Sequence, residues 1–243
     1  METTIRIMDL DIDMISMDSF LSKVEEYLTN DYLNVILFAT TKVLEEASEN
    51  DEYKEMLSRA ELILPGEEAL LSMHHVDVLE VARMVINYQC FDKMLDSIQE
   101  NSTMYLVGRS EYEMNQMKEY CIRNHPHINI VGTCFLDIEQ NGDVVINEIN
   151  GLAPDILVFS LDSPLQETWI LTNCTKMNAK LCIGMGGVIN NIFEQNREIP
   201  RFVQMLHLEK LYNLLKKNKR LNKIRQARIF KRKIAHYKNK KSE

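Results

Sequence analysis

The feature that most constrains the fold is a short, unbroken apolar run, Ile156–Phe159. Turn-forming residues lie on both sides of it, from Pro154 before the run to Pro164 after it. A run of this length without polar alternation predicts a strand that is buried on both faces, as in a parallel sheet. We therefore expect this strand to lie near the middle of an α/β domain.

A helix is predicted directly after this strand, with Pro164 in its first turn and Asp162 or Ser163 as its cap. Gln166 and Glu167 are expected to project from that turn toward a ligand. The end of a parallel strand beside a helix N-terminus is where open α/β sheets bind ligands, and its free N–H groups favour phosphate. An ordinary connection between a strand and a helix is the alternative interpretation.

Similar apolar runs recur along the chain and predict further buried strands. The pattern from 103 to 132, a strand, a glycine, a helix and a second strand, is typical of a βαβ unit. The sequence thus predicts an α/β domain of about six mostly parallel strands with helices on both faces. The other predicted strands are 34–39, 61–64, 103–107, 128–131 and 180–183, with 5–12 as a weaker first strand and 143–149 as an extended approach to the central run.

Two predicted strand ends carry residues that suit a phosphate ligand. Arg109 follows the strand at 103–107, and a guanidinium beside a helix N-terminus suits a pyrophosphate. An exposed loop arginine is the alternative. Gly184 and Gly186 follow the last predicted strand, where glycines let the backbone approach a ligand closely.

The distribution of charge is strongly asymmetric. From Lys210 to the C-terminus the chain holds 14 lysines and arginines and one acid, whereas the preceding residues hold 14 basic and 35 acidic side chains. Leu211, Leu215, Leu221 and Ile224 continue an apolar stripe at helical spacing through this basic segment. A basic amphipathic helix predicts binding to an anionic membrane surface. Nucleic acid is a rival partner that the acidic body would repel, and a solvated basic helix is the third alternative.

Cysteine use and hydropathy exclude several classes of protein. The five cysteines are scattered and form no C-x-x-C pair, which favours free thiols in a cytoplasmic chain and disfavours structural zinc. No apolar run approaches the roughly 18–20 residues that span a bilayer. His74 and His75 are adjacent, so on a helix they point about 100° apart and do not form a metal pair.

The order G-x-x-P-D followed by P-x-Q-E-x-W-I resembles the signature of the WecG/TagA/CpsF glycosyltransferases, glycosyltransferase family 26. The family pattern has glycines where this chain has Ser160 and Asp162. The resemblance runs from the first strand to about residue 225. From it, together with the strand count and the charge pattern, we expect a Rossmann-like core at 1–199 and a basic helical appendage at 200–243. The residues that carry the signature are Gly151, Pro154, Asp155, Pro164, Gln166, Glu167, Trp169 and Ile170.

The resemblance also implies site residues at the other strand ends. Family members close one strand in T-x-N and the next in P-D-G, whose aspartate is taken to be the catalytic base. In this chain Thr40 matches the threonine, Lys42 stands at the asparagine position and Gly66 stands at the aspartate position. Glu67 carries the same chemical group one residue later and is the candidate base, with a solvated acid that opens a helix as the alternative.

Thr40 and Glu67 are therefore the expected catalytic residues. The family's nucleotide-sugar pocket corresponds to glycine-containing strand ends of this chain, and its C-terminal pattern extends to an arginine of the basic segment. The residues expected to bind substrate are Gly108, Arg109, Gly132, Asp155, Gln166, Glu167, Gly184, Gly186 and Arg220.

By this resemblance the protein is expected to be an inverting transferase. It would move an N-acetylhexosamine, with N-acetylmannosamine as the first candidate, from a UDP-sugar to a polyprenyl-diphosphate-linked sugar in the synthesis of bacterial cell-surface polysaccharide or teichoic acid. No metal and no other cofactor is expected. The protein is expected to be cytoplasmic and bound peripherally at the inner face of the cell membrane. The alternative is a catalytically impaired member of the family that acts as a nucleotide-sugar-binding subunit or as a partner subunit. In either case the protein is a candidate homo-oligomer.

The basic segment gives a testable prediction. Truncation after Leu208 should abolish sedimentation with anionic liposomes, because each Lys or Arg near an anionic surface contributes about 1 kcal/mol. The intact chain should bind neutral liposomes only weakly, and part of its anionic binding should resist salt because apolar residues are buried as well. Truncated protein that still sediments with anionic liposomes would contradict the prediction.

Overall fold

The protein is described here from a computed structural model, which covers residues 3–67, 70, 88–186, 229–230, 232–235 and 237. The chain divides into two compact units, Met1–Ile189 and Asn190–Glu243. The expected division into 1–199 and 200–243 stays a prediction. In the second unit the described residues, 229–230, 232–235 and 237, are helical.

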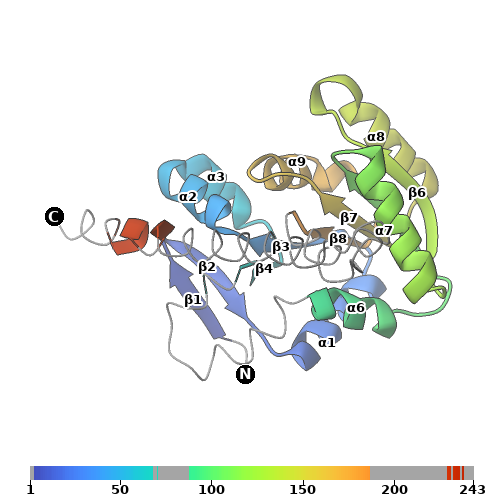
Figure 1. The fold of residues 1–243 in the computed structure, drawn as a ribbon, viewed down its shortest axis with the longest axis horizontal. Helices are drawn as coiled ribbons and strands as arrows, with labels where there is room; N and C mark the ends of the chain where they lie inside the picture. The colour runs from blue at the N-terminus through green and yellow to red at the C-terminus, as the bar shows by residue number, and fades with distance from the viewer. Residues whose placement is uncertain are drawn as a thin grey trace, which may run out of the picture. The chain divides into compact units, whose positions relative to one another are not determined.

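A six-stranded sheet organises the first unit, and all of its strands are parallel (Figure 1). Its spatial order is β4-β3-β8-β7-β5-β6. The expected α/β fold with a parallel sheet is thereby confirmed. The strands are β3 Asn34–Ala39, β4 Leu62–Pro65, β5 Thr103–Gly108, β6 Asn129–Phe135, β7 Ile156–Ser160 and β8 Leu181–Gly184.

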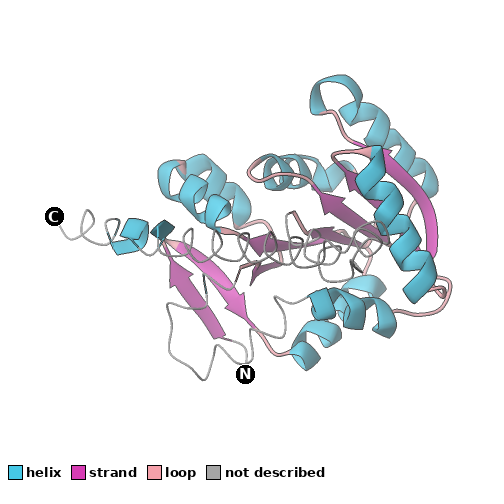
Figure 2. Cartoon of the chain, viewed as in Figure 1, coloured by secondary structure: helices cyan, strands magenta, loops and turns pink. Residues whose placement is uncertain are grey.

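Helices cover both faces of the sheet, as Figure 2 shows. The right-handed rule for parallel crossovers places helices that lead toward β4 on one face and helices that lead toward β6 on the other. Contacts between α3 and α9, and between α1 and α6, agree with this assignment. The first face carries α2 Thr41–Glu49, α3 Asp51–Leu57, α8 Ile138–Leu152 and α9 Leu165–Asn173, and the second carries α1 Met17–Thr29, α6 Tyr88–Ser97 and α7 Glu111–Asn124.

The expected central strand is the best buried part of the sheet. Every residue of β7 is buried, and Ile156, Leu157 and Phe159 have no exposed surface. β5 and β8 pair with it on its two sides, so helices must cover both of its faces. Full burial of one such side chain contributes about 1.5–3 kcal/mol, which makes β7 the anchor of the core.

Four of the described helices begin with side-chain caps that the sequence favours. Each cap accepts a hydrogen bond from the backbone N–H of the third helical residue, and the caps are Ser16 of α1, Thr40 of α2, Asn50 of α3 and Ser110 of α7. The expected cap of α9 by Asp162 or Ser163 is wrong. The N-cap is Pro164 without a side-chain bond, and the backbone carbonyl of Asp162 accepts from the Gln166 N–H at 3.1 Å instead.

Two expectations about the segments before and around the central sheet differ from the structure. The segment 143–149 is helical and belongs to α8, because Val145, Ile146 and Ile149 are spaced to bury one helical face. The expected first strand is instead an antiparallel hairpin of β1 Thr3–Ile7 and β2 Leu10–Met14, outside the six-stranded sheet. The two turn residues, Met8 and Asp9, have φ angles of 49° and 64°, as tight hairpin turns require.

No helix in the described ranges is long and apolar enough to cross a membrane.

A buried histidine joins two helices on the second face. His125 is 3% exposed, and its Nδ1 lies 2.9 Å from Asp96 Oδ1 while its Nε2 lies 3.2 Å from Asp92 Oδ1. The Tyr120 hydroxyl also donates to Asp92, and the His127 ring lies edge-on to His125. Burial alone would lower the pKa of His125, but the bonds and charges of the two aspartates outweigh it and raise the pKa above its usual value.

This pair of carboxylates makes stability depend on pH. Because the folded-state pKa of His125 is raised, its contribution is complete below the unfolded value of about 6.5 and is lost as pH rises through the folded value. We expect the free energy of unfolding to fall between pH 6 and pH 9, measured by urea titration. The variant Asp92→Asn/Asp96→Asn should show a smaller fall, and parallel losses in both proteins would contradict this origin.

Candidate functional site

The candidate site lies at the carboxyl edge, the edge of the sheet at which all six parallel strands end. The chain leaves β5 toward β6 on one side, whereas it leaves β7 toward β8 on the other. The two strands are adjacent, so the helices that follow them, α7 and α9, lie on opposite faces of the sheet (Figure 1). Such a change of direction is where open α/β sheets bind their ligands.

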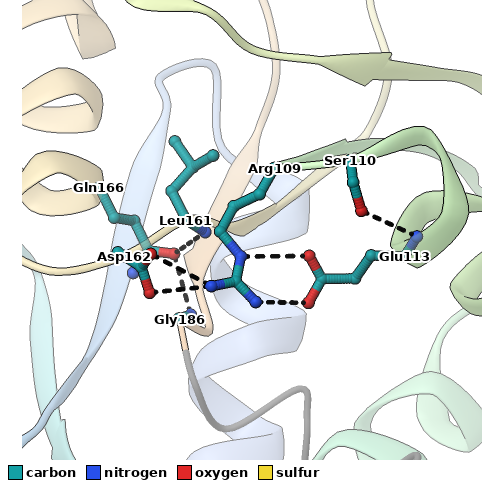
Figure 3. Close-up of polar contacts among 7 residues, drawn as sticks. All are labelled: Arg109, Ser110, Glu113, Leu161, Asp162, Gln166 and Gly186. Carbon is teal, nitrogen blue, oxygen red and sulfur yellow. Dashed lines mark hydrogen bonds and ion pairs between the residues drawn. The ribbon is translucent and has the colours of Figure 1, made fainter.

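Arg109 follows β5 at this point, and its guanidinium lies between two carboxylates (Figure 3). Its Nη1 donates to both carboxylate oxygens of Asp162 at 3.1 Å. Its Nε and Nη2 donate to Glu113 at 3.4 and 3.3 Å. These bonds to Glu113 raise the pKa of Arg109, so the group is charged and suited to an anionic ligand.

Local packing explains why β5 ends and α7 begins here. The Ser110 hydroxyl oxygen accepts from the Glu113 N–H at 3.3 Å and caps the helix. A Cβ atom at Gly108 would lie 2.2 Å from Met114 Cε, so the glycine lets Met114 pack against the end of the strand. Gly108 thus lies at the carboxyl edge as expected, next to Arg109.

Gln166 occupies the first turn of α9 but points into the protein. It is 1% exposed, and its Oε1 accepts from the Leu161 N–H at 3.2 Å and the Gly186 N–H at 2.9 Å (Figure 3). Gly186 has a φ angle of 50°, a conformation that suits glycine. The expectation that Gln166 projects toward a ligand is therefore wrong, and the side chain instead ties the loop after β7 to the loop after β8.

Glu167 is also turned inward, contrary to expectation. It is 1% exposed, and its carboxylate accepts from the Tyr53 hydroxyl at 3.1 Å and the Ser163 hydroxyl at 2.9 Å. Burial raises the pKa of Glu167, against the opposing effect of these hydrogen bonds. The network joins α9 to α3, and Gln166 Nε2 completes it by donating to Glu167 at 3.2 Å.

The expected catalytic residues come together at neighbouring strand ends. Thr40 follows β3, and its Oγ1 accepts from the Val43 N–H at the start of α2. Glu67 follows β4, and its Oε2 accepts from the Thr41 N–H at 3.3 Å. The first turn of α2 therefore holds both side chains at one end of the carboxyl edge, where a helix N-terminus stabilises negative charge.

Gly66 is packed too tightly to carry a side chain without a backbone shift. Its N–H donates to the Ala39 carbonyl at 2.7 Å. An added Cβ atom would lie 2.8 Å from that carbonyl oxygen and 3.2 Å from Phe38 Cβ. In this chain Gly66→Asp is therefore not a simple restoration of the family's pattern.

Two expected binding residues lie elsewhere, and one is outside the described ranges. Asp155 precedes β7 at the opposite edge of the sheet, where it accepts from Thr103 N and Oγ1 and pairs with Lys180. A cavity of about 590 Å³ lies at that edge, lined in part by α1, Asp155 and Lys180. Gly132 is inside β6, where a Cβ atom would lie 2.5 Å from the Tyr105 ring, and Arg220 lies outside the described residues.

Sequence reasoning missed the partners of the expected residues. Tyr53 and Glu167 are 114 positions apart, and no sequence pattern connects them. Glu113 lies four residues after Arg109 on a predicted helix, and that spacing is a signal for an ion pair. Asp162 was considered as a cap and as a departure from a glycine of the family pattern, and not as a partner of Arg109.

Groups of three or more potential metal ligands do not occur in the described part of the chain. His74 and His75 fall outside it. The closely spaced acids Asp9, Asp11 and Asp13 lie in the N-terminal hairpin and its turn, and Asp13 accepts from the Ile63 N–H at 2.8 Å.

Comparison with known proteins agrees with the signature in the sequence. The model of the glycosyl transferase WecG/TagA/CpsF family matches residues 5–241. A Staphylococcus aureus (strain MRSA252) protein named N-acetylglucosaminyldiphosphoundecaprenol N-acetyl-beta-D-mannosaminyltransferase is 23% identical over 96% of this chain and 93% of its own length. The protein of the same name from strain MW2 is 22% identical over the same shares.

The two hydrogen bonds by which Gln166 bridges the loops after β7 and β8 predict that loss of this side chain destabilises the protein. Gln166→Ala should lower the free energy of unfolding by about 2–6 kcal/mol, because two buried N–H groups lose their acceptor at about 1–3 kcal/mol each. Gln116→Ala, which removes an exposed hydrogen bond to Tyr112, is the matched control and should change it by less than about 0.5 kcal/mol. Urea unfolding measures both, and equal effects would rule out the bridge.

Proposed function

Because this chain belongs to the WecG/TagA/CpsF family and is a glycosyltransferase, we propose that it transfers an N-acetylhexosamine from a UDP-sugar to a polyprenyl-diphosphate-linked sugar. N-acetylmannosamine is the first candidate for the sugar, since it is named for the Staphylococcus aureus relatives. The product would serve the synthesis of cell-surface polysaccharide or teichoic acid. No metal cofactor is part of the proposal.

The observation that carries this proposal is Arg109 at the adjacent ends of β5 and β7. A nucleotide sugar presents a diphosphate, and guanidinium groups recognise its oxygens through paired hydrogen bonds. The side chain of Arg109 is 44% exposed, so a ligand can reach it. As the diphosphate leaves, the same charge would stabilise the negative charge that develops on it.

The acceptor end of the proposed site is the pair Thr40 and Glu67. Three strand spacings, from β3 through β8 and β7 to β5, separate Arg109 from the strand end that carries Thr40, where the Thr41 N–H also holds the Glu67 carboxylate. At about 4.8 Å each they amount to roughly 14 Å, which leaves room for the sugar and its acceptor between diphosphate and base. Both ends lie on the same edge because every strand is parallel.

In the proposed reaction Glu67 takes the proton of the acceptor hydroxyl. That oxygen bonds to the anomeric carbon of the donor, and the bond from this carbon to the UDP oxygen breaks with its electron pair. Attack from the face opposite UDP inverts the anomeric configuration. Thr40 would orient the acceptor, and Arg109 would hold the departing UDP.

One observation favours the second candidate, a catalytically impaired member that binds nucleotide sugar. The family's aspartate position is Gly66, and the Ala39 carbonyl closes the space that a side chain there would need. In this alternative Glu67 serves only as an anchor for α2 through the Thr41 N–H. Binding of UDP without turnover would support it.

The basic segment completes the proposal. A lipid-linked acceptor resides in a membrane, and the charges of 200–243 would hold the enzyme at an anionic surface. Arg220, which lies in this segment, is proposed to meet substrate there. Localisation at the inner face of the membrane is part of the same proposal.

The role of Glu67 is tested by Glu67→Gln. Turnover of UDP-N-acetylmannosamine with a lipid-linked acceptor should fall by a factor of about 10²–10⁴, because the amide cannot take the acceptor's proton. The affinity for UDP, measured by calorimetry, should remain within about twofold. Glu52→Gln, in the exposed first turn of α3, is the control and should leave both quantities unchanged. A Glu67→Gln variant that turns over like the parent would exclude Glu67 as the base.

A further inference from the structure

All three nitrogens of the Arg109 guanidinium are engaged within the protein. Glu113 accepts from Nε and Nη2 on one side, and Asp162 accepts twice from Nη1 on the other (Figure 3). A diphosphate would need some of the same N–H groups. A guanidinium carries five N–H groups, so one N–H of Nη2 is left over, but an anion that binds through both Nη1 and Nη2 must replace Asp162 on Nη1.

The two carboxylates differ in how firmly they are held. The Glu113 side chain is 9% exposed, and it stands one helical turn after Arg109 in the chain. The Asp162 side chain is 63% exposed and comes from the separate loop after β7. An exposed ion pair shifts an equilibrium by no more than about fivefold, so the bond to Asp162 is the one that exchanges readily.

We propose that Asp162 occupies the place of the ligand's diphosphate on Arg109 and thereby sets the affinity of the site for diphosphates. This inference rests on the proposed function. Glu113 is a fixed partner that orients the guanidinium, and Asp162 is an internal competitor. When a diphosphate binds, the Asp162 carboxylate returns to water, and when the diphosphate leaves, the carboxylate takes back Nη1.

Charge strengthens this competition. A diphosphate beside Arg109 would lie close to Asp162, and like charges at such distances repel each other. Asp162 therefore lowers affinity in two ways, by holding the guanidinium and by repelling the ligand. The second effect is screened by salt, whereas the first depends on direct contact.

Asp162→Asn removes the charge and keeps the size of the side chain. Calorimetric titration with UDP should show affinity about two- to tenfold higher than in the parent, with the larger gain at low ionic strength. Glu111→Gln is the matched control, because it removes an exposed acid from the first turn of α7 and leaves the contacts of Arg109 intact. That variant should bind UDP within about twofold of the parent.

A double variant separates this role from a merely structural one. In Arg109→Gln the substitution Asp162→Asn should give a clearly smaller gain than in the parent, because it relieves only the repulsion and there is no guanidinium to release. A gain of equal size with and without Arg109 would overturn the proposal, and so would equal affinity of Asp162→Asn and the parent for every diphosphate tested. If neither the parent nor Asp162→Asn binds UDP, the result would instead contradict the proposed function.

The source of the diphosphate is distinguished by a second titration. Geranyl diphosphate presents the same group on a prenyl chain and lacks the nucleoside. A gain with UDP assigns Arg109 to the sugar donor, and a gain with geranyl diphosphate alone assigns it to the lipid-linked acceptor. Both results support competition by Asp162, and a gain with neither ligand contradicts it.

Discussion

Parallel pairing of β7 with β5 and β8 is the constraint on which the rest of the first unit depends. Because these strands run in one direction, their ends and the loops that follow lie at one edge of the sheet. The crossover helices must then lie on the two faces, and the direction of the crossovers changes between β5 and β7. The position of Arg109 at that change follows from the order of strands.

A buried polar network secures this edge. One oxygen of Gln166 accepts N–H groups from two loops, and Glu167 beside it accepts hydroxyl groups from Tyr53 and Ser163. Loops after parallel strands have few regular partners for their backbone groups, so buried side chains must provide them. The signature residues Gln166 and Glu167 therefore build the frame of the site.

The sequence predicted the parts of the fold that depend on local pattern. The strand at 34–39 is observed with the same bounds, because a buried parallel strand is a continuous apolar run. The segment 143–149 was interpreted as an approach to the central strand, yet Val145, Ile146 and Ile149 bury one face of α8. Burial against the rest of the protein thus favoured the helical period of about 3.6 residues over the strand period of two residues.

The candidate site was predictable in part. The apolar runs indicate a parallel sheet, and in a parallel sheet the residues that end or follow the strands lie at one edge. These residues include Thr40, Glu67, Gly108 and Arg109. The direction of a side chain on a helix does not follow from its position in the first turn, so Gln166 was placed wrongly. Asp155 was placed by its signature, although a residue that precedes a parallel strand must lie at the opposite edge.

The hydrogen bond from the Ile63 N–H to Asp13 has a consequence for assembly. β4 is an outer strand of the sheet, and β2 lies against it. An outer strand ordinarily offers its backbone groups to a strand of another molecule, and a charged side chain directed at them prevents such pairing. Asp13 thus protects the β4 side against intermolecular strand addition, which leaves β6 as the other outer strand of the six described strands of this sheet.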